Sequence, residues 1–433
     1  MGAKRGAGEL RHNAPFVRFW TASTVSDFGT YITTVALAVL VLVTLGGSAQ
    51  DQGWVSAARW APYLLFGLVA GIWVDHFSRT TVLVAADLGR GVLLALLCIG
   101  GVAGWLNVPL VVVVIFAFGM LSMLGDAADR SLLTQLVPRP LLVKANARLQ
   151  QSDTVAQTVG GAVAGGLVAA LTAPFALLLD AASFLFSGAI MASLPRRRPL
   201  RNTGVGPTLS ARIGESLRWA YGHRFIGPMA WSTHVWFIGS AMLGTVLPVL
   251  VLHDAGLGAV ALGLVLSCAG VGAVIGTGIS LRAGQRWGTG PVMVVARGFE
   301  ALSVVLLAIV AGAVPGWHEA GVPPGPVVGC IGAAQLVWGI ALGTGSPLEM
   351  GFQQAVTPDA MIARMSSVIR SANRGMIVIG APVGGLIATV AGVAVALWVA
   401  AGFICLGLVL LAASPFRTAR IEDEMLDDEA AAG

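Results

Sequence analysis

Twelve runs of mostly apolar residues, each about 20 residues or longer, dominate this sequence. Because a helix rises 1.5 Å per residue, about 20 apolar residues cross a hydrocarbon core that is about 30 Å thick. Only helices and closed barrels satisfy their backbone polar groups in lipid, and these runs are too long for barrel strands. Charged residues make up only 11% of the chain. The sequence therefore predicts an all-α polytopic membrane protein with spans at 16–45, 54–74, 81–104, 108–130, 145–172, 174–194, 226–252, 258–282, 291–314, 325–348, 365–393 and 395–414.

Positive residues predict the orientation of these spans. Of 26 Lys and Arg residues, 23 lie before the first span or in alternate connections after it. By the positive-inside rule, both termini are cytoplasmic. The net charge of +5 is thus a topological signal, and no nucleic-acid partner is needed to explain it. The four cysteines lie in different apolar runs without metal-ligand spacing, so we expect no metal and no cofactor.

The longest polar stretch divides the chain into two halves. We expect an N-terminal six-helix bundle over 1–194, a linker over 195–225, a C-terminal bundle over 226–414 and an acidic cytoplasmic tail over 415–433. Apolar residues at helical spacing in 209–221 predict a short linker helix, either on the membrane surface or solvated. A shift of 220 places Pro138 on Pro358 and Gly160 on Gly380, which indicates parallel repeats. Small residues let membrane helices pack closely, and the predicted packing glycines are Gly160, Gly165, Gly380 and Gly384.

A charged motif interrupts the apolar pattern between the second and third spans, in GIWVDHFSRT. Gly71, Asp75, Arg79 and Thr80 resemble the G-x-x-x-D-x-x-x-R-[RKT] loop of the major facilitator superfamily. The resemblance implies two six-helix bundles in pseudo-twofold arrangement and a conformational latch that releases during transport. Residues assigned to this latch are Gly71, Asp75, Arg79, Arg90, Asn373 and Arg374. Alternatively, Asp75 and Arg79 only anchor the loop in water.

A narrower resemblance covers most of the chain. FVRFW, SAARWAPYLLFGLVAGIWVD, LLTQLVPRPLLVKANA and LLLDAASFLF are similar to segments of the bacterial branch that contains the enterobactin exporter and macrolide-efflux proteins. This implies export of bulky, partly hydrophobic molecules such as lipophilic drugs, siderophores or related metabolites. We expect a monomer in the bacterial inner membrane, with protons and membrane lipids as its other partners. Two departures leave proton coupling open: the fourth span lacks a mid-membrane Arg motif, and Gly161 replaces the proline of the antiporter motif.

Charged residues within spans are costly, so each is a functional candidate. Asp27 lies roughly 16 Å into the first span, and Arg59 is expected at a similar depth. They form either a fixed ion pair or a proton-exchange site. In the second half, Glu300 and Arg297 lie one turn apart near the midplane. His234 and Asp180 are weaker candidates, and a lone histidine such as His234 is more often packed and hydrogen-bonded.

Aromatic residues are expected to line the cavity beside these polar groups, because pockets for hydrophobic ligands are mainly apolar. The candidates are Phe28, Tyr31, Trp231, Trp236 and Phe237. The substrate classes weighed are a lipophilic small molecule exchanged for protons, a lipid flipped on the same scaffold, and a lipid-linked substrate of a membrane enzyme. External loops are too short to supply a catalytic site, and no nucleotide-binding loop is present, so we expect a transporter and not an enzyme.

Overall fold

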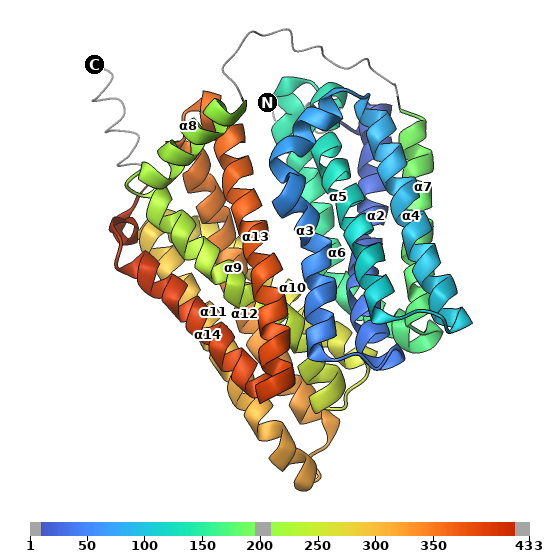
Figure 1. Ribbon diagram of the computed structural model, residues 1–433. Coiled ribbons are helices and arrows are strands. Elements are labelled where there is room, and N and C mark those ends of the chain that lie inside the picture. The colour runs from blue at the N-terminus through green and yellow to red at the C-terminus, as the bar shows by residue number, and fades with distance from the viewer. Residues whose placement is uncertain (1–9, 195–208, 421–433) are drawn as a thin grey trace. The chain divides into compact units, whose positions relative to one another are not determined.

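The computed structural model describes residues 10–194 and 209–420, apart from some side chains within these ranges, including those of 68–72 and Asp75 (Figure 1). Eleven helices in the described chain are long and apolar enough to cross a membrane, and α3 is a further long helix. This confirms the predicted all-helical membrane architecture. The long helices are α2 (Ala14–Val39), α3 (Ala49–Asp75), α4 (Arg79–Ala103), α5 (Val108–Leu136), α6 (Leu142–Leu171), α7 (Ala173–Ala192), α9 (Ile226–Val249), α10 (Ala259–Trp287), α11 (Thr289–Glu319), α12 (Pro324–Val356), α13 (Asp359–Ala391) and α14 (Val393–Ala412).

Side-chain caps set several helix starts. Asn13 accepts a hydrogen bond from the backbone of Phe16 before α2, and Asn107 accepts one from Leu110 before α5. These contacts satisfy backbone donors that a helix start leaves without partners. Helix ends depart more from the apolar pattern. α5 continues to Leu136 and α12 to Val356, beyond the predicted ends at 130 and 348, because a helix continues into water after its apolar stretch stops.

Backbone contacts divide the chain into two compact units. Unit 1 comprises Met1–Gly47, Ala58–Gly204 and Gly258–Ser267, whereas unit 2 comprises Ser48–Ala57, Val205–Leu257 and Cys268–Gly433. The start of α3 thus belongs to unit 2, and the start of α10 belongs to unit 1. The linker contains α8 (Leu209–Gly222), which packs against α9 and α13. Ala220 of α8 is fully buried in unit 2, so this helix is docked on protein.

The structure shows the internal repeat in helix boundaries and backbone angles as well as in the sequence alignment. The ends of α6 and α13 differ by 220 positions, as do both boundaries of α7 and α14, and each helix pair turns on one residue with positive φ. Thr172 has φ 73° and ψ 161° at the first corner, and Gly392 has φ 93° and ψ 159° at the second. α2 and α9 likewise end in π-helical turns, η1 (Leu40–Thr44) and η3 (Leu250–Asp254). Corresponding helices therefore share local geometry as well as order.

Glycine allows the closest helix contacts. In unit 2, a Cβ built on Gly276 of α10 would lie 2.2 Å from the carbonyl oxygen of Ile340 on α12, whereas one on Gly278 would meet nothing within 4 Å. The four glycines singled out from the sequence also lie at close contacts. An added Cβ would approach another helix within 2.9 Å at Gly160, 2.5 Å at Gly165, 2.5 Å at Gly380 and 2.8 Å at Gly384.

Candidate functional site

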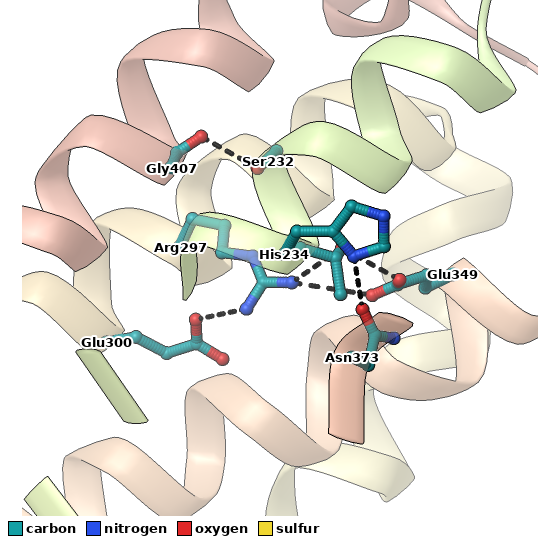
Figure 2. A network of polar contacts seen from close by, with 8 residues as sticks. Ser232, His234, Arg297, Glu300, Glu349, Asn373 and Gly407 are labelled. Atoms are coloured by element: carbon teal, nitrogen blue, oxygen red, sulfur yellow. Dashed lines mark hydrogen bonds and ion pairs between the residues drawn. The ribbon is translucent and has the colours of Figure 1, made fainter. Parts of the chain in front are cut away.

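Arg297 is the centre of a buried polar network in unit 2 (Figure 2). It lies on α11 one turn before Glu300, so the two side chains share a helix face. Its Nη1 donates to Glu300 Oε2 at 2.9 Å, and the two side chains are only 7% and 3% exposed. The predicted pairing of these residues is present in the structure.

Glu349 of α12 is the second carboxylate that contacts Arg297, and Figure 2 shows it on the other side of the guanidinium from Glu300. Arg297 Nη2 lies 3.4 Å from Glu349 Oε2 and 3.3 Å from Thr233 Oγ1. Thr233, on α9, donates to Glu349 Oε1 at 2.9 Å. Both carboxylate oxygens of Glu349 are therefore engaged, and α9, α11 and α12 are connected by one set of polar contacts.

Aromatic rings pack beside Arg297 in this network. The Arg297 guanidinium lies 4.5 Å from the ring centroid of Trp236, close enough for a cation–π contact. Trp236 stacks on Trp338 with centroids 5.8 Å apart, and Phe237 meets it edge-on at 4.9 Å. The cation–π contact with Trp236 therefore adds to the ionic contacts of the guanidinium.

His234 is the packed, hydrogen-bonded histidine that its surroundings in the sequence favour. Its Nδ1 lies 2.6 Å from Asn373 Oδ1 on α13, and its Nε2 lies 2.7 Å from the Tyr221 hydroxyl on α8. Because a carboxamide oxygen only accepts, Nδ1 donates to Asn373 and the neutral ring accepts at Nε2 from Tyr221. Burial raises the pKa of the Tyr221 phenol, so it keeps the proton that it donates. His234 therefore connects the linker helix to two membrane helices.

A cavity of about 330 Å³ adjoins the network between α9, α12 and α13. Trp236 and Phe237 contribute its aromatic wall, as expected from the sequence, and Arg297 and Glu349 contribute charge. The other polar side chains of the lining are three hydroxyls, three carboxamides and a second arginine: Thr233, Ser346, Ser366, Gln353, Gln354, Asn373 and Arg370. Trp231 is 58% exposed and does not line this cavity, since it faces away from Trp236 on the helix and contacts Tyr221 and His234 instead.

Asp27 lies in a different polar cluster, in unit 1. It is within electrostatic range of three carboxylates, those of Asp126, Asp129 and Asp153, and of the Arg90 guanidinium. No ion pair joins Asp27 to Arg59 within residues 10–194 and 209–420. The expected pair is not formed, and the Arg59 guanidinium lies 5.7 Å from the ring centroid of Phe118 and 5.9 Å from that of Trp60.

Two hydroxyl groups hold Asp180 in the interior of unit 1. Thr33 donates to Asp180 Oδ2 at 2.5 Å, and Ser183 donates to Oδ1 at 2.8 Å. Asp180 has no exposed surface, so its carboxylate is a structural contact between α2 and α7. Phe28 and Tyr31 are half-buried, and the Tyr31 hydroxyl donates to Asp153 at 3.3 Å. Tyr31 thus belongs to the acidic cluster around Asp27.

The proposed latch residues occupy separate places. Arg79 is buried and donates to Ser131 and to two carbonyls of its own loop, so it fixes the turn between α3 and α4. Arg90 pairs with Asp87 and lies 4.3 Å from the ring of Phe184. Asn373 bonds His234, and Arg374 follows it on α13. The side chain of Asp75 and the surroundings of Gly71 lie outside the described residues, and the latch itself stays a prediction.

Sequence reasoning missed Glu349 and Arg370. Glu349 lies one residue beyond the predicted span 325–348, whereas the helix continues to Val356. The sequence marks Arg370 only as one of the 23 positive residues that predict the orientation, whereas the structure places it in the cavity wall. Helical spacing contained a usable signal, because Glu349 and Gln353 are four residues apart and face the same side.

Similarity to known proteins covers nearly the whole chain. Residues 8–430 match a major facilitator superfamily (MFS) family model described as a transmembrane secretion effector. Among curated proteins, the chain is 28% identical over 184 residues to the uncharacterized MFS-type transporter y4rN of Sinorhizobium fredii, covering 42% of this chain and 44% of the relative. It is 24% identical over 187 residues to the uncharacterized MFS-type transporter YfiS of Bacillus subtilis, covering 43% and 44%. The chain thus spans less than half the length of these relatives.

Solved transporters share the fold at low sequence identity. A bacterial homologue of the iron transporter ferroportin, in its inward-facing state, matches with TM-score 0.71 and 14% identity over 94% of this chain and 99% of that one. The nucleoside transporter NupG matches with TM-score 0.72 and 13% identity over 92% and 98%. A bacterial homologue of the lysosomal transporter Spinster has TM-score 0.62 and 13% identity over 96% and 98%. At this identity the matches establish the fold alone.

Proposed function

The chain belongs to the transmembrane secretion effector family of the major facilitator superfamily, and we propose that it is a proton-coupled exporter of lipophilic small molecules across the bacterial inner membrane. Drugs, siderophores and related metabolites are the substrate classes that its resemblance to the enterobactin-exporter and macrolide-efflux branch favours. The proposal depends chiefly on one observation: unit 1 contains an acidic cluster around Asp27, and unit 2 contains a polar cavity beside Arg297. Separate centres suit exchange of a proton for a substrate.

The substrate centre has the properties of a site for an apolar molecule with a few polar groups. Its volume of about 330 Å³ and its aromatic wall suit such a ligand. Its lining also favours export. Gln353 lies three residues before the end of α12, near the connection to α13. Positive residues predict that this connection is cytoplasmic, so a cytoplasmic molecule would load the cavity from that end.

The proton centre is the Asp27 cluster. Three other carboxylates lie within electrostatic range of Asp27, and the nearby Arg90 is already paired with Asp87. Like charges this close repel, and a proton on one of them relieves the repulsion. Asp27 lies deepest in the membrane by its position in α2, so we assign it the exchange of a proton for substrate.

Proteoliposomes with an imposed pH gradient test this function. Wild-type protein should move a lipophilic dye against its concentration gradient and move protons the opposite way. Asp27→Asn should still equilibrate the dye down its gradient but lose the pH-driven accumulation. Glu215→Gln is the matched control, because Glu215 is 60% exposed and pairs only with the surface residue Arg364 among the described residues. pH-driven accumulation by Asp27→Asn at the wild-type rate would reject the assignment.

A lipid flippase is the second candidate function, and a groove in unit 2 favours it. A cavity of about 650 Å³ lies between α10, α11 and α12 and is lined almost entirely by apolar side chains. Trp287, Val295 and Phe299 in its wall are more than half exposed, so an acyl chain could enter from the bilayer. The same proteoliposomes, assayed with a fluorescent phospholipid, distinguish the two functions. Lipid translocation without dye efflux would favour the flippase.

A further inference from the structure

Arg370 differs from the other charged groups of the cavity in unit 2. It lies on α13, half-buried, and lines the same cavity as Arg297 and Glu349. Among the described residues of unit 2, no carboxylate lies within ion-pair distance of its guanidinium. An arginine that lines a cavity without such a partner can bind an anionic group of a ligand there.

Neither Glu349, which lines the cavity, nor Glu300, which does not, can take a similar role for a cation. Glu349 accepts from Thr233 with one oxygen and faces Arg297 with the other. Glu300 accepts from Arg297 and is 3% exposed. The negative charge is therefore occupied by protein donors, whereas the positive charge of Arg370 is available to a ligand.

The remaining lining defines the rest of the ligand. Trp236 and Phe237 offer apolar ring surface, and Trp236 is held by its stack on Trp338 and by Arg297. Gln353 and Gln354 add carboxamides that can donate hydrogen bonds to oxygen atoms. A planar guanidinium with amide donors nearby matches a carboxylate, sulfonate or phosphate group, because arginine binds such groups through two parallel N–H donors.

We propose that this cavity binds an amphipathic organic anion, with its acidic group on Arg370 and its flat apolar part against Trp236 and Phe237. That the bound anion is exported rests on the proposed function. The proposal narrows the substrate class from lipophilic molecules to lipophilic acids. Binding itself requires neither the proton gradient nor Asp27.

Equilibrium binding to purified full-length protein in detergent tests the proposal. The probes share one naphthalene ring: 1-naphthaleneacetate as the anion, 1-naphthaleneacetamide as its neutral isostere, and 1-naphthylmethylammonium as the cation. Calorimetric titration, corrected with protein-free micelles, gives the three dissociation constants. Wild-type protein should bind the anion about tenfold or more tightly than the amide, as expected for a charge-assisted hydrogen bond, and the cation most weakly.

Two substitutions assign the preference to Arg370. Arg370→Gln should reduce anion affinity to that of the amide and leave amide affinity unchanged, while Arg370→Lys should keep part of the preference. Arg282→Gln is the control, because Arg282 is an exposed arginine of α10 outside this cavity. Equal binding of anion and amide by wild type, tightest binding of the cation, or equal loss of all three probes in Arg370→Gln would each overturn the proposal.

The outcomes separate this inference from the proposed function. Asp27→Asn should bind the anion with wild-type affinity, because Asp27 does not line the cavity. Selective anion binding without pH-driven transport would reject proton coupling and support the anion site. Proton-coupled transport of neutral or cationic dyes, with no anion preference in binding, would reject the anion site and support the coupling.

Discussion

Removal of the Arg297 charge should destabilise unit 2 more than any change at an exposed arginine. Arg297→Gln leaves Glu300 as a carboxylate that is 3% exposed and has lost its 2.9 Å ion pair. Removal of one partner from a buried pair costs about 3–5 kcal/mol, because the remaining charge is buried without compensation. Glu349 adds less, since its contact is longer, at 3.4 Å, and its side chain is 17% exposed. We therefore expect a loss of about 3–5 kcal/mol in total.

A double variant distinguishes lost charge compensation from lost packing. In Arg297→Gln/Glu300→Gln, no orphaned carboxylate remains at position 300, so more than half of the lost stability should return. The assay is the apparent melting midpoint of purified protein at one heating rate in one detergent, because membrane proteins often unfold irreversibly. At about 2–4 °C per kcal/mol for a unit of this size, the single variant should lose on the order of 10 °C.

Arg282→Gln is again the control and should shift the midpoint by less than about 2 °C, as surface substitutions rarely change stability by more than 0.5 kcal/mol. The electrostatic reasoning fails if Arg297→Gln melts with the wild type. It also fails if the double variant is no more stable than the single one, because the loss would then come from packing against Trp236.

Two further predictions concern the backbone. Gly276→Ala should force α10 and α12 apart and reduce the monodisperse fraction in size-exclusion chromatography. Gly278→Ala, with open space around its Cβ, should elute as wild type. Equal monodisperse fractions for the two variants would contradict the close approach. Thr172→Gly should raise the melting midpoint, because Thr172 adopts a backbone conformation that is almost restricted to glycine and costs about 1–3 kcal/mol. Gly392→Thr at the corresponding corner should lower the midpoint, and a rise there would refute the strain argument.

The apolar runs were sufficient to predict the helices, because in lipid the backbone has almost no alternative to a helix. Helix ends were predicted less well. Hydropathy records where the bilayer stops, and α12 continues past that point to Val356. Glu349 was missed for this reason, although it completes the network around Arg297.

The sequence also predicted some charge pairs and not others. Arg297 and Glu300 could be paired from the sequence, because spacing on one helix fixes which side chains share a face. Asp27 and Arg59 could not, because depth along two helices does not determine how each is rotated about its axis. The structure places Asp27 near other carboxylates and Arg59 near Phe118.

The sequence by itself determined that this chain forms membrane-spanning helices in two repeated halves, since hydrophobicity, helix length and repeat spacing are local or linear properties. Only the tertiary structure decided which polar groups meet. Contacts such as those between Arg297 and Glu349, or between His234, Tyr221 and Asn373, join residues 13 to 139 positions apart and depend on how helices pack. The cavity lined by Arg370 exists only after that packing is complete.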